Sequence, residues 1–148
     1  KPNRAELAEV VDLPLESLRD VIGAARELRS WGAGSVLASL GADGAVLVDG
    51  SGVVTGDAPA VRPRSSVGAG DALLAGFLSV IVADEKHTDG KQTENHTTGS
   101  QRALHEALAW GAAAVSLPGS QMPGPADLRR DRVRIHSQPD EVRPPLAS

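Results

Sequence analysis

Two glycines and an aspartate near the middle of the chain could together bind an anion and place a base beside it. Gly68, Ala69 and Gly70 directly precede Asp71, where an extended segment gives way to a helical pattern. Glycine lets the backbone aim its N–H groups at one point, and the following helix adds its own unpaired N–H groups and positive dipole end. A phosphate would bind there, and Asp71 could take a proton from an acceptor hydroxyl. The same residues also fit a tight turn and a helix cap, so the spacing alone leaves both interpretations open.

The elements that would position this motif follow from caps and apolar periodicity. Asn3 and Glu6 have the spacing of a capping box at the start of a helix. The helix after the motif is small or apolar almost all round, which predicts that it is buried, and Gly76 is expected to let a neighbouring element come close. Spacings of three and four predict helices over residues 4–11, 13–31, 72–82 and 102–116, and short apolar runs between glycine-rich turns predict strands over residues 35–40, 45–49, 53–55 and 133–135.

Composition excludes several classes of protein. The net charge of −4 and an aromatic content of 2% argue against nucleic acid as a partner, and no apolar run approaches the roughly 18 residues of a membrane span. The absence of cysteine rules out disulfides and thiolate metal sites and fits a cytoplasmic protein. The sequence has neither a Gly-x-x-x-x-Gly-Lys-Ser/Thr loop nor a Gly-x-Ser-x-Gly elbow. A Walker-type nucleotide site and a serine hydrolase are therefore excluded.

The chain divides into one long unit and a short tail. Residues 1–137 carry the predicted helices and strands, whereas residues 138–148 are rich in proline. Residues 84–100 are polar and show no apolar periodicity, so we expect a flexible, solvated insertion there. The length of the chain, 148 residues, predicts a single domain.

The central motif resembles the signature of the ribokinase-like sugar kinases, the phosphofructokinase B family. It reads Val-Gly-Ala-Gly-Asp at residues 67–71 and is followed by Ala-Gly-Phe at residues 75–77. The resemblance implies an α/β fold of three layers, α/β/α, with a mostly parallel sheet, of which this chain would form the C-terminal half. It also implies that Asp71 is the catalytic base and that the amides of residues 68–70 form an anion hole. Ser65 and Val67, in the same motif, would lie against the nucleotide.

A second motif, Lys-Pro-Asn-x-x-Glu at residues 1–6, is similar to the Asn-x-x-Glu motif of the same family. The resemblance implies that Asn3 and Glu6 hold a Mg²⁺ ion, mostly through waters, and that Lys1 lies by the nucleotide. A hard cation that retains several waters needs few protein oxygens, so one amide and one carboxylate suffice. Without the resemblance, the pair is explained by helix capping alone.

A third motif, residues 39–44, resembles the family's Ser/Thr-x-Gly-x-x-Gly loop. The resemblance implies that Ser39, Gly41 and Gly44 approach the phosphates of ATP, where a side chain would stand in the way. The end of the predicted helix over residues 102–116 would wall the adenine pocket, which makes Ser116 a further nucleotide-binding candidate. Judged by local sequence only, the glycines of residues 41–44 make a hairpin turn.

Residues 109–120, followed by Met122 and Pro123, are similar to fructose-1-phosphate kinases in particular. The resemblance therefore implies an ATP- and Mg²⁺-dependent kinase that converts fructose 1-phosphate to fructose 1,6-bisphosphate. The alternatives are another phosphosugar kinase, acting on fructose 6-phosphate or tagatose 6-phosphate, and a nucleotide-binding fragment without catalysis. Because the family's sugar-holding residues come from its N-terminal half, we expect that half, or a second copy in a homo-oligomer, to be the partner of this chain.

Overall fold

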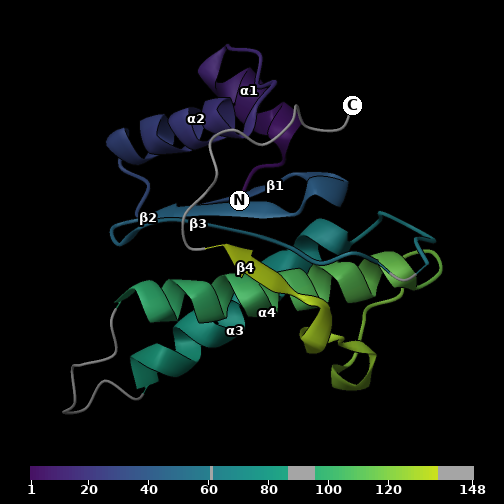
Figure 1. The fold of residues 1–148 in the computed structure, drawn as a ribbon. Helices are drawn as coiled ribbons and strands as arrows, with labels where there is room; N and C mark the ends of the chain where they lie inside the picture. The colour runs from purple at the N-terminus through teal and green to yellow at the C-terminus, as the bar shows by residue number, and fades with distance from the viewer. Residues whose placement is uncertain (61, 87–95, 137–148) are drawn as a thin grey trace.

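The computed structural model describes residues 1–60, 62–86 and 96–136, and it places one sheet between two helical layers (Figure 1). Helices α1 (Arg4–Val11) and α2 (Leu18–Ser30) cover one face, and α3 (Ala69–Lys86) and α4 (His96–Ser116) cover the other. The strands are β1 (Val36–Ser39), β2 (Ala45–Asp49), β3 (Gly52–Asp57) and β4 (Arg134–His136), and single 3-10 turns are η1 (Gly41–Asp43), η2 (Pro125–Asp127) and η3 (Arg130–Arg132). The α/β class and its three layers are confirmed.

The sheet differs from the mostly parallel one that the resemblance implied. Its strand order is β1-β2-β3-β4, and all three of these pairs are antiparallel. The reason is local, because parallel neighbours need a crossover of about a dozen residues or more, whereas η1 and a tight turn join the first three strands. A parallel contact is present where the N-terminus meets β1: Asn3 and Ser39 form an isolated parallel bridge, and the Ser39 N–H donates to the Pro2 carbonyl at 3.1 Å.

Side chains of β1 and β2 are buried on both faces of the sheet, as their apolar runs predicted. Val46 and Val48 pack with α1 and α2, whereas Ala45 and Leu47 pack with α3 and α4. The alternation follows from the two-residue period of a strand. The sheet is therefore the middle layer, with a separate apolar cluster on each of its faces.

Capping boxes set where the first two helices begin. In α1, the Asn3 side chain accepts the Glu6 N–H at 2.9 Å, and Glu6 accepts the Asn3 N–H at 2.8 Å, which confirms the predicted cap. The second helix was predicted to start at Leu13, but α2 starts at Leu18. Ser17 and Asp20 form its capping box, and this pair of short polar side chains defines the helix start more strongly than the apolar pattern before it.

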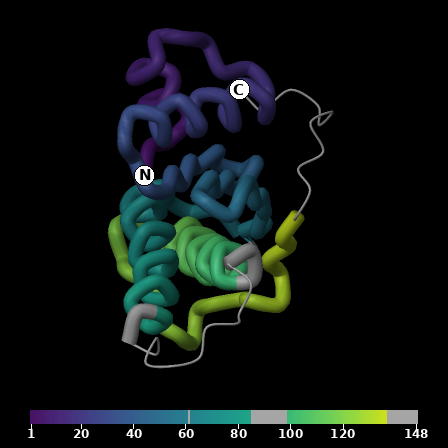
Figure 2. The backbone as a smooth tube through the Cα atoms, turned by 90° about the vertical axis from the view of Figure 1, so that its left-hand side faces the viewer, coloured from purple at the N-terminus to yellow at the C-terminus, as the bar shows by residue number. Residues whose placement is uncertain are grey.

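Helices α3 and α4 lie side by side on the same face of the sheet, as Figures 1 and 2 both show. A Cβ on Gly76 would lie 2.8 Å from the Glu106 carbonyl oxygen, so Gly76 does let α4 come close, as predicted. The prediction that the helix after the motif is buried was wrong for part of α3: Ala72 and Leu73 are buried, but Leu78 and Val82 are each 45% exposed. Along the described ranges, none of the helices combines the length and the hydropathy that crossing a bilayer would take.

The prediction of a flexible insertion over residues 84–100 was wrong at both of its ends, because α3 continues to Lys86 and α4 begins at His96. Polar contacts hold these helix ends: Arg102 lies 3.4 Å from the Asp84 carboxylate, and the Ser100 hydroxyl donates to Asp49 at 2.6 Å. A pattern of apolar residues could not reveal an end stabilised in this way. Residues 87–95 and the predicted tail, residues 138–148, lie outside the described part of the chain.

Candidate functional site

The predicted anion-binding turn leads directly into α3. The Ser65 hydroxyl accepts the Val67 N–H at 3.2 Å, and Gly68 has a φ of +76°, a left-handed conformation that favours glycine. The Gly68 carbonyl then accepts the Ala72 N–H at 2.9 Å and starts the helical ladder. The turn is thus built by a serine that bonds the backbone and by one glycine that reverses its direction.

The amides of this turn are used unequally. The Ala69 N–H points to the Ser66 carbonyl at 3.3 Å. The N–H groups of Gly70 and Asp71 lie in the first turn of α3, and within the described residues neither has a backbone acceptor. First-turn amides carry the positive end of the helix dipole, so these two groups can bind an anion.

Lys1 brings a positive charge to the same turn. Its Nζ lies 2.7 Å from the position that a Cβ on Gly70 would occupy, although the two residues are far apart in the sequence. The bond between Ser39 and Pro2 fixes the N-terminal segment beside β1 and so directs Lys1 toward α3. The structure therefore brings together two of the predicted motifs that are far apart in the sequence.

Asp71 is exposed at the start of α3. Across the described residues its carboxylate makes neither a hydrogen bond with a side chain nor an ion pair. An exposed carboxylate with unused acceptor positions can take a proton from a hydroxyl brought to it. A hydroxyl held at Asp71 would therefore lie close to an anion bound by the Gly70 amide and the Lys1 ammonium.

The predicted metal ligands Asn3 and Glu6 are partly occupied by each other. Asn3 Oδ1 and Glu6 Oε2 both serve the capping box, which leaves Glu6 Oε1 for other contacts. In the part of the chain that is described, no three histidine or acidic side chains gather as a metal cage would require. The pair fits only an ion that keeps most of its waters, as Mg²⁺ does.

The glycines of residues 41–44 have two different roles. Gly44 has a φ of +93°, and a Cβ there would collide with the Gly56 carbonyl oxygen, so the hairpin itself requires this glycine. Gly41 has a φ of +61°, and nothing lies within 4 Å of the place of its Cβ. Only Gly41 therefore faces space that a ligand could use, while Ser39 at the end of β1 gives its N–H to Pro2.

Ser116, at the end of α4, lies near the turn that carries Ser65. The Val115 carbonyl accepts the N–H groups of Arg64 at 2.8 Å and Ser65 at 3.3 Å, which ties the end of α4 to the approach of the anion-binding turn. The Ser116 hydroxyl donates to the Ala112 carbonyl at 2.9 Å and lines a small cavity. These bonds bring Ser116 to the same end of the α3–α4 layer as Gly68.

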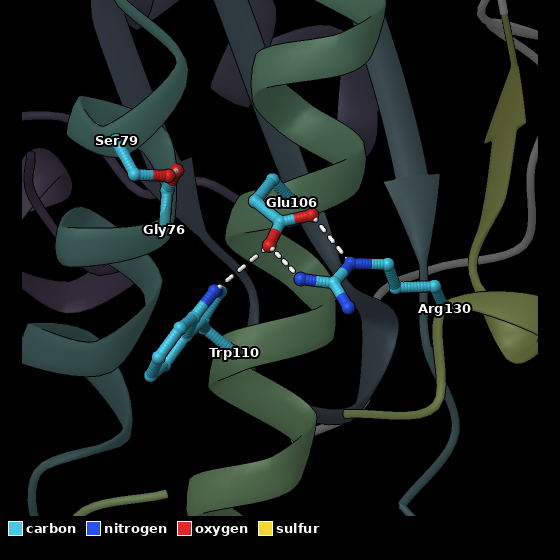
Figure 3. A network of polar contacts seen from close by, with 5 residues as sticks. All are labelled: Gly76, Ser79, Glu106, Trp110 and Arg130. Carbon is cyan, nitrogen blue, oxygen red and sulfur yellow. Dashed lines mark hydrogen bonds and ion pairs between the residues drawn. The ribbon is translucent and has the colours of Figure 1, made fainter. Parts of the chain in front are cut away.

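Sequence reasoning missed a polar network around Glu106, which Figure 3 shows from close by. The Glu106 carboxylate accepts from Trp110 Nε1 at 2.9 Å and from Arg130 Nε and an Arg130 terminal nitrogen at 2.8 and 2.5 Å. The hydrogen bonds from Arg130 hold the pKa of Glu106 below its usual range, despite partial burial, and the same bonds raise the pKa of Arg130. The spacing of four between Glu106 and Trp110 was readable in the sequence, but the contact with Arg130 was not.

Comparisons with known proteins agree on one family. The family model described as pfkB family carbohydrate kinase matches residues 1–126. The chain is 33% identical over 135 residues to a 1-phosphofructokinase of Haloferax volcanii and 34% identical over 139 residues to a 1-phosphofructokinase of Escherichia coli. These alignments cover 91% and 94% of this chain but 40% of each relative. The solved phosphofructokinase-2 of Escherichia coli in complex with substrates and products matches 85% of this chain and 37% of its own, with 28% identity and a TM-score of 0.69.

Proposed function

The chain belongs to the pfkB family of carbohydrate kinases, and on that premise we propose that it carries the phosphoryl-transfer half of a kinase that moves the γ-phosphate of ATP to a hydroxyl of a phosphosugar. The observation that carries the proposal is the meeting of three groups at the start of α3. They are the exposed Asp71, the unpaired Gly70 amide and the Lys1 ammonium. Transfer of a phosphoryl group to a hydroxyl uses these three parts: a base, an oriented hydrogen-bond donor and a cation.

In the proposed mechanism, Asp71 accepts the proton of the attacking hydroxyl. The amides of Gly70 and Asp71 donate to the transferred phosphoryl group, and Lys1 offsets the charge that grows on its oxygens. Asn3 and Glu6 would hold Mg²⁺ through waters, and this ion, when bound, neutralises phosphate charge. Gly41 leaves room for the rest of the phosphate chain, and Ser116 lies toward the far end of the nucleotide.

Fructose 1-phosphate is the proposed acceptor, with fructose 1,6-bisphosphate as the product. Its support is that the curated relatives named above are both 1-phosphofructokinases. Fructose 6-phosphate or tagatose 6-phosphate is the second candidate, because the fold of the chain also matches phosphofructokinase-2.

The residues that hold the sugar are proposed to lie outside these 148 residues. The chain spans about 40% of the length of the curated relatives it matches, and β1 has a strand partner on one side, β2, with only the bridge to Asn3 described at its other edge. An open strand edge invites pairing with another chain. The partner would be the N-terminal half of the enzyme or a second copy of this chain.

A coupled assay tests this proposal in two samples, the 148-residue chain and the longest gene product that contains it. ATP binding by both, with phosphorylation of fructose 1-phosphate by the longer protein, is expected. The variant Asp71→Asn should lower the chemical step by ~10²–10⁴-fold and leave ATP binding nearly intact, whereas Asp131→Asn, another exposed carboxylate, should change neither. Turnover that survives Asp71→Asn would remove Asp71 from the mechanism. ATP binding without turnover in either sample would leave only the non-catalytic alternative.

A further inference from the structure

One face of α3 is apolar and open to solvent along much of its length. The helix packs against α4 through the opposite face, where Ala72, Leu73 and Gly76 are buried. Leu78 and Val82, on the open face, are each 45% exposed. By the 3.6-residue period of a helix, this face carries five apolar residues, which we call the α3 stripe: Leu74, Ala75, Leu78, Ile81 and Val82.

The sequence of α3 does not suit a face that stays in water. Residues 72–83 include no charged residue, and Ser79 is the only polar one among them. Its hydroxyl is already used, because it donates to the Gly76 carbonyl at 2.7 Å (Figure 3). A helix on the surface of a protein usually has polar residues on its solvent side, whereas an apolar helix is typical of a buried layer. An exposed apolar face of this kind indicates a surface that binds another element.

The α3 stripe lies on the same side of the molecule as the open edge of β1. Figure 2 shows α4 between α3 and β4, and the strand order places β1 at the far end of the sheet from β4. The N-terminal segment links the two places: Asn3 bridges the outer edge of β1 at Ser39, and Lys1 approaches Gly70 at the start of α3. An element that extends the sheet beyond β1 would therefore lie beside the stripe.

The bridge at this edge favours another part of the enzyme over a second copy of the chain. The bridge between Asn3 and Ser39 is parallel, whereas pairing of β1 with its own copy about a two-fold axis would be antiparallel. The length of the relatives agrees with this choice. The alignments cover 40% of each 1-phosphofructokinase, so the larger part of these relatives has no counterpart in the chain.

We propose that the α3 stripe is the surface on which a helix of the N-terminal half of the kinase packs. The inference rests on the proposed function, which places the sugar-holding residues outside these 148 residues. The layer on this face of the sheet is helical, so its next member should be a helix as well. Asp71 lies on the same face of α3, one turn before Ala75. The helix that covers the stripe would therefore end or begin beside the proposed base.

Thiol labelling of the longest gene product that contains the chain tests the proposal. The 148 residues include no cysteine, so Leu78→Cys introduces the thiol to be followed, and the unsubstituted protein gives the background. Val10→Cys is the matched control, because Val10 is a 54% exposed residue of α1, on the other face of the sheet. In the folded protein, the thiol at position 78 should react at least about tenfold more slowly than the control. The two rates should be equal after denaturation.

A charged substitution gives a second, independent measurement on the same protein. Leu78→Lys would bury an unpaired charge, so the melting temperature should fall by at least about 6 °C. Val10→Lys should stay within about 2 °C of the unsubstituted protein. In the 148-residue chain, where the stripe is open, the thiols of Leu78→Cys and Val10→Cys should react at similar rates.

The outcomes separate this inference from the proposed function, because labelling does not depend on turnover. Equal labelling rates at the two positions in the longer protein would overturn the inference and leave the phosphoryl-transfer proposal standing. Slow labelling at position 78 without phosphorylation of any phosphosugar would support the packing and overturn the proposed reaction. Slow labelling in the 148-residue chain that dilution relieves would show that a second copy covers the stripe, and the inference would be wrong.

Discussion

Lys1 and Gly70 share one small volume: the lysine Nζ lies 2.7 Å from the point that a Cβ on Gly70 would occupy. A side chain at residue 70 would therefore displace this cation. Gly68, two residues earlier, is a glycine for another reason, since its φ of +76° is a left-handed conformation and no atom closer than 3.9 Å would meet its Cβ. The two glycines of the motif should therefore respond differently to the same substitution.

Gly70→Ala should displace the Lys1 ammonium and spare the fold. The end of a lysine side chain moves at little cost, so we expect the melting temperature to stay within about 2 °C of the wild type. Affinity for Mg²⁺-ATP should fall by about tenfold, because the cation leaves the anion-binding turn. Isothermal titration of the wild type, Gly70→Ala and Lys1→Met would check this, with equal losses expected in the two variants. Undiminished affinity in Gly70→Ala would show that the ammonium does not serve the site.

Gly68→Ala should act on stability instead. A non-glycine residue in the left-handed region costs about 1–2 kcal/mol, so the free energy of unfolding should drop by that amount. Denaturant unfolding of both variants separates the two effects: the conformational cost at Gly68 lowers stability, whereas the displacement of Lys1 at Gly70 does not. The assignment would fail if Gly70→Ala were the less stable of the two.

Glu6→Gln separates the helix cap from the proposed metal ligand. Glutamine at the third helical position can still accept the Asn3 N–H, so the capping box and the melting temperature should survive. Removal of the carboxylate charge should nevertheless raise the Mg²⁺ concentration needed for half-maximal ATP binding, by several-fold. Asn3→Ala is the complementary variant, because it removes the cap and should cost about 1 kcal/mol of stability. If Glu6→Gln leaves the Mg²⁺ requirement unchanged, Glu6 is a cap alone.

The parts of the fold that were predictable from the sequence depend on neighbours along the chain. The capping box of Asn3 and Glu6 repeats a known spacing, and Gly76 stands in an apolar helix where only close packing explains it. By contrast, the contacts of Lys1 with Gly70 and of Glu106 with Arg130 join distant segments. No local pattern encodes them, because they depend on how the layers stack.

The same limit explains why Gly44 was assigned to the phosphate loop on resemblance alone. Its backbone conformation is fixed by the neighbouring β3, whose Gly56 carbonyl excludes any side chain at residue 44. A glycine in a loop motif can thus be required by the sheet, by a ligand or by both. The sequence does not distinguish these cases, whereas the open space beside Gly41 does.

Ser100→Ala should destabilise the chain, although Ser100 lies in the segment first expected to be a flexible insertion. Its hydroxyl donates to Asp49 at 2.6 Å and meets the Ser51 hydroxyl at 3.1 Å, so it joins the start of α4 to the β2–β3 turn. A hydrogen bond to a charged group contributes about 1.5–3 kcal/mol, and partial exposure lowers that to about 1–2. Ser120→Ala, at an exposed serine, is the matched control and should be neutral.

Two deletions test the same point on a larger scale. Shortening within residues 87–95 should change the free energy of unfolding only slightly, since the entropy of loop closure depends weakly on length. Deleting residues 84–100 removes Ser100 and the Asp84 partner of Arg102, and should destabilise the fold by more than Ser100→Ala does. Equal stability of the two deletion variants would mean that the described helix ends contribute nothing.

The ion pair of Glu106 and Arg130 should make stability depend on pH in a defined window. The folded pKa of Glu106 is lowered, chiefly by hydrogen bonds from Arg130. A carboxyl group with a depressed folded pKa stabilises the fold above its unfolded pKa, near 4.5, and loses that contribution as pH falls through the folded value. Arg130 keeps its charge throughout this window, because its pKa is raised from an already high value.

Glu106→Gln should therefore be less stable than the wild type near pH 7, and the gap should close as the pH falls well below 4.5. We expect a gap of about 1 kcal/mol, since the Arg130 side chain is 48% exposed and solvent weakens the pair. That corresponds to about 2–4 °C in melting temperature for a chain of this size.

Other carboxyl groups with lowered pKa values, such as Asp49 and Asp20, will destabilise every variant in acid, so the difference between variants is the measurement. Glu9→Gln, at an exposed carboxylate, gives the baseline. A gap that persists unchanged into acid would show that the charge of Glu106 is not the source of its contribution to stability.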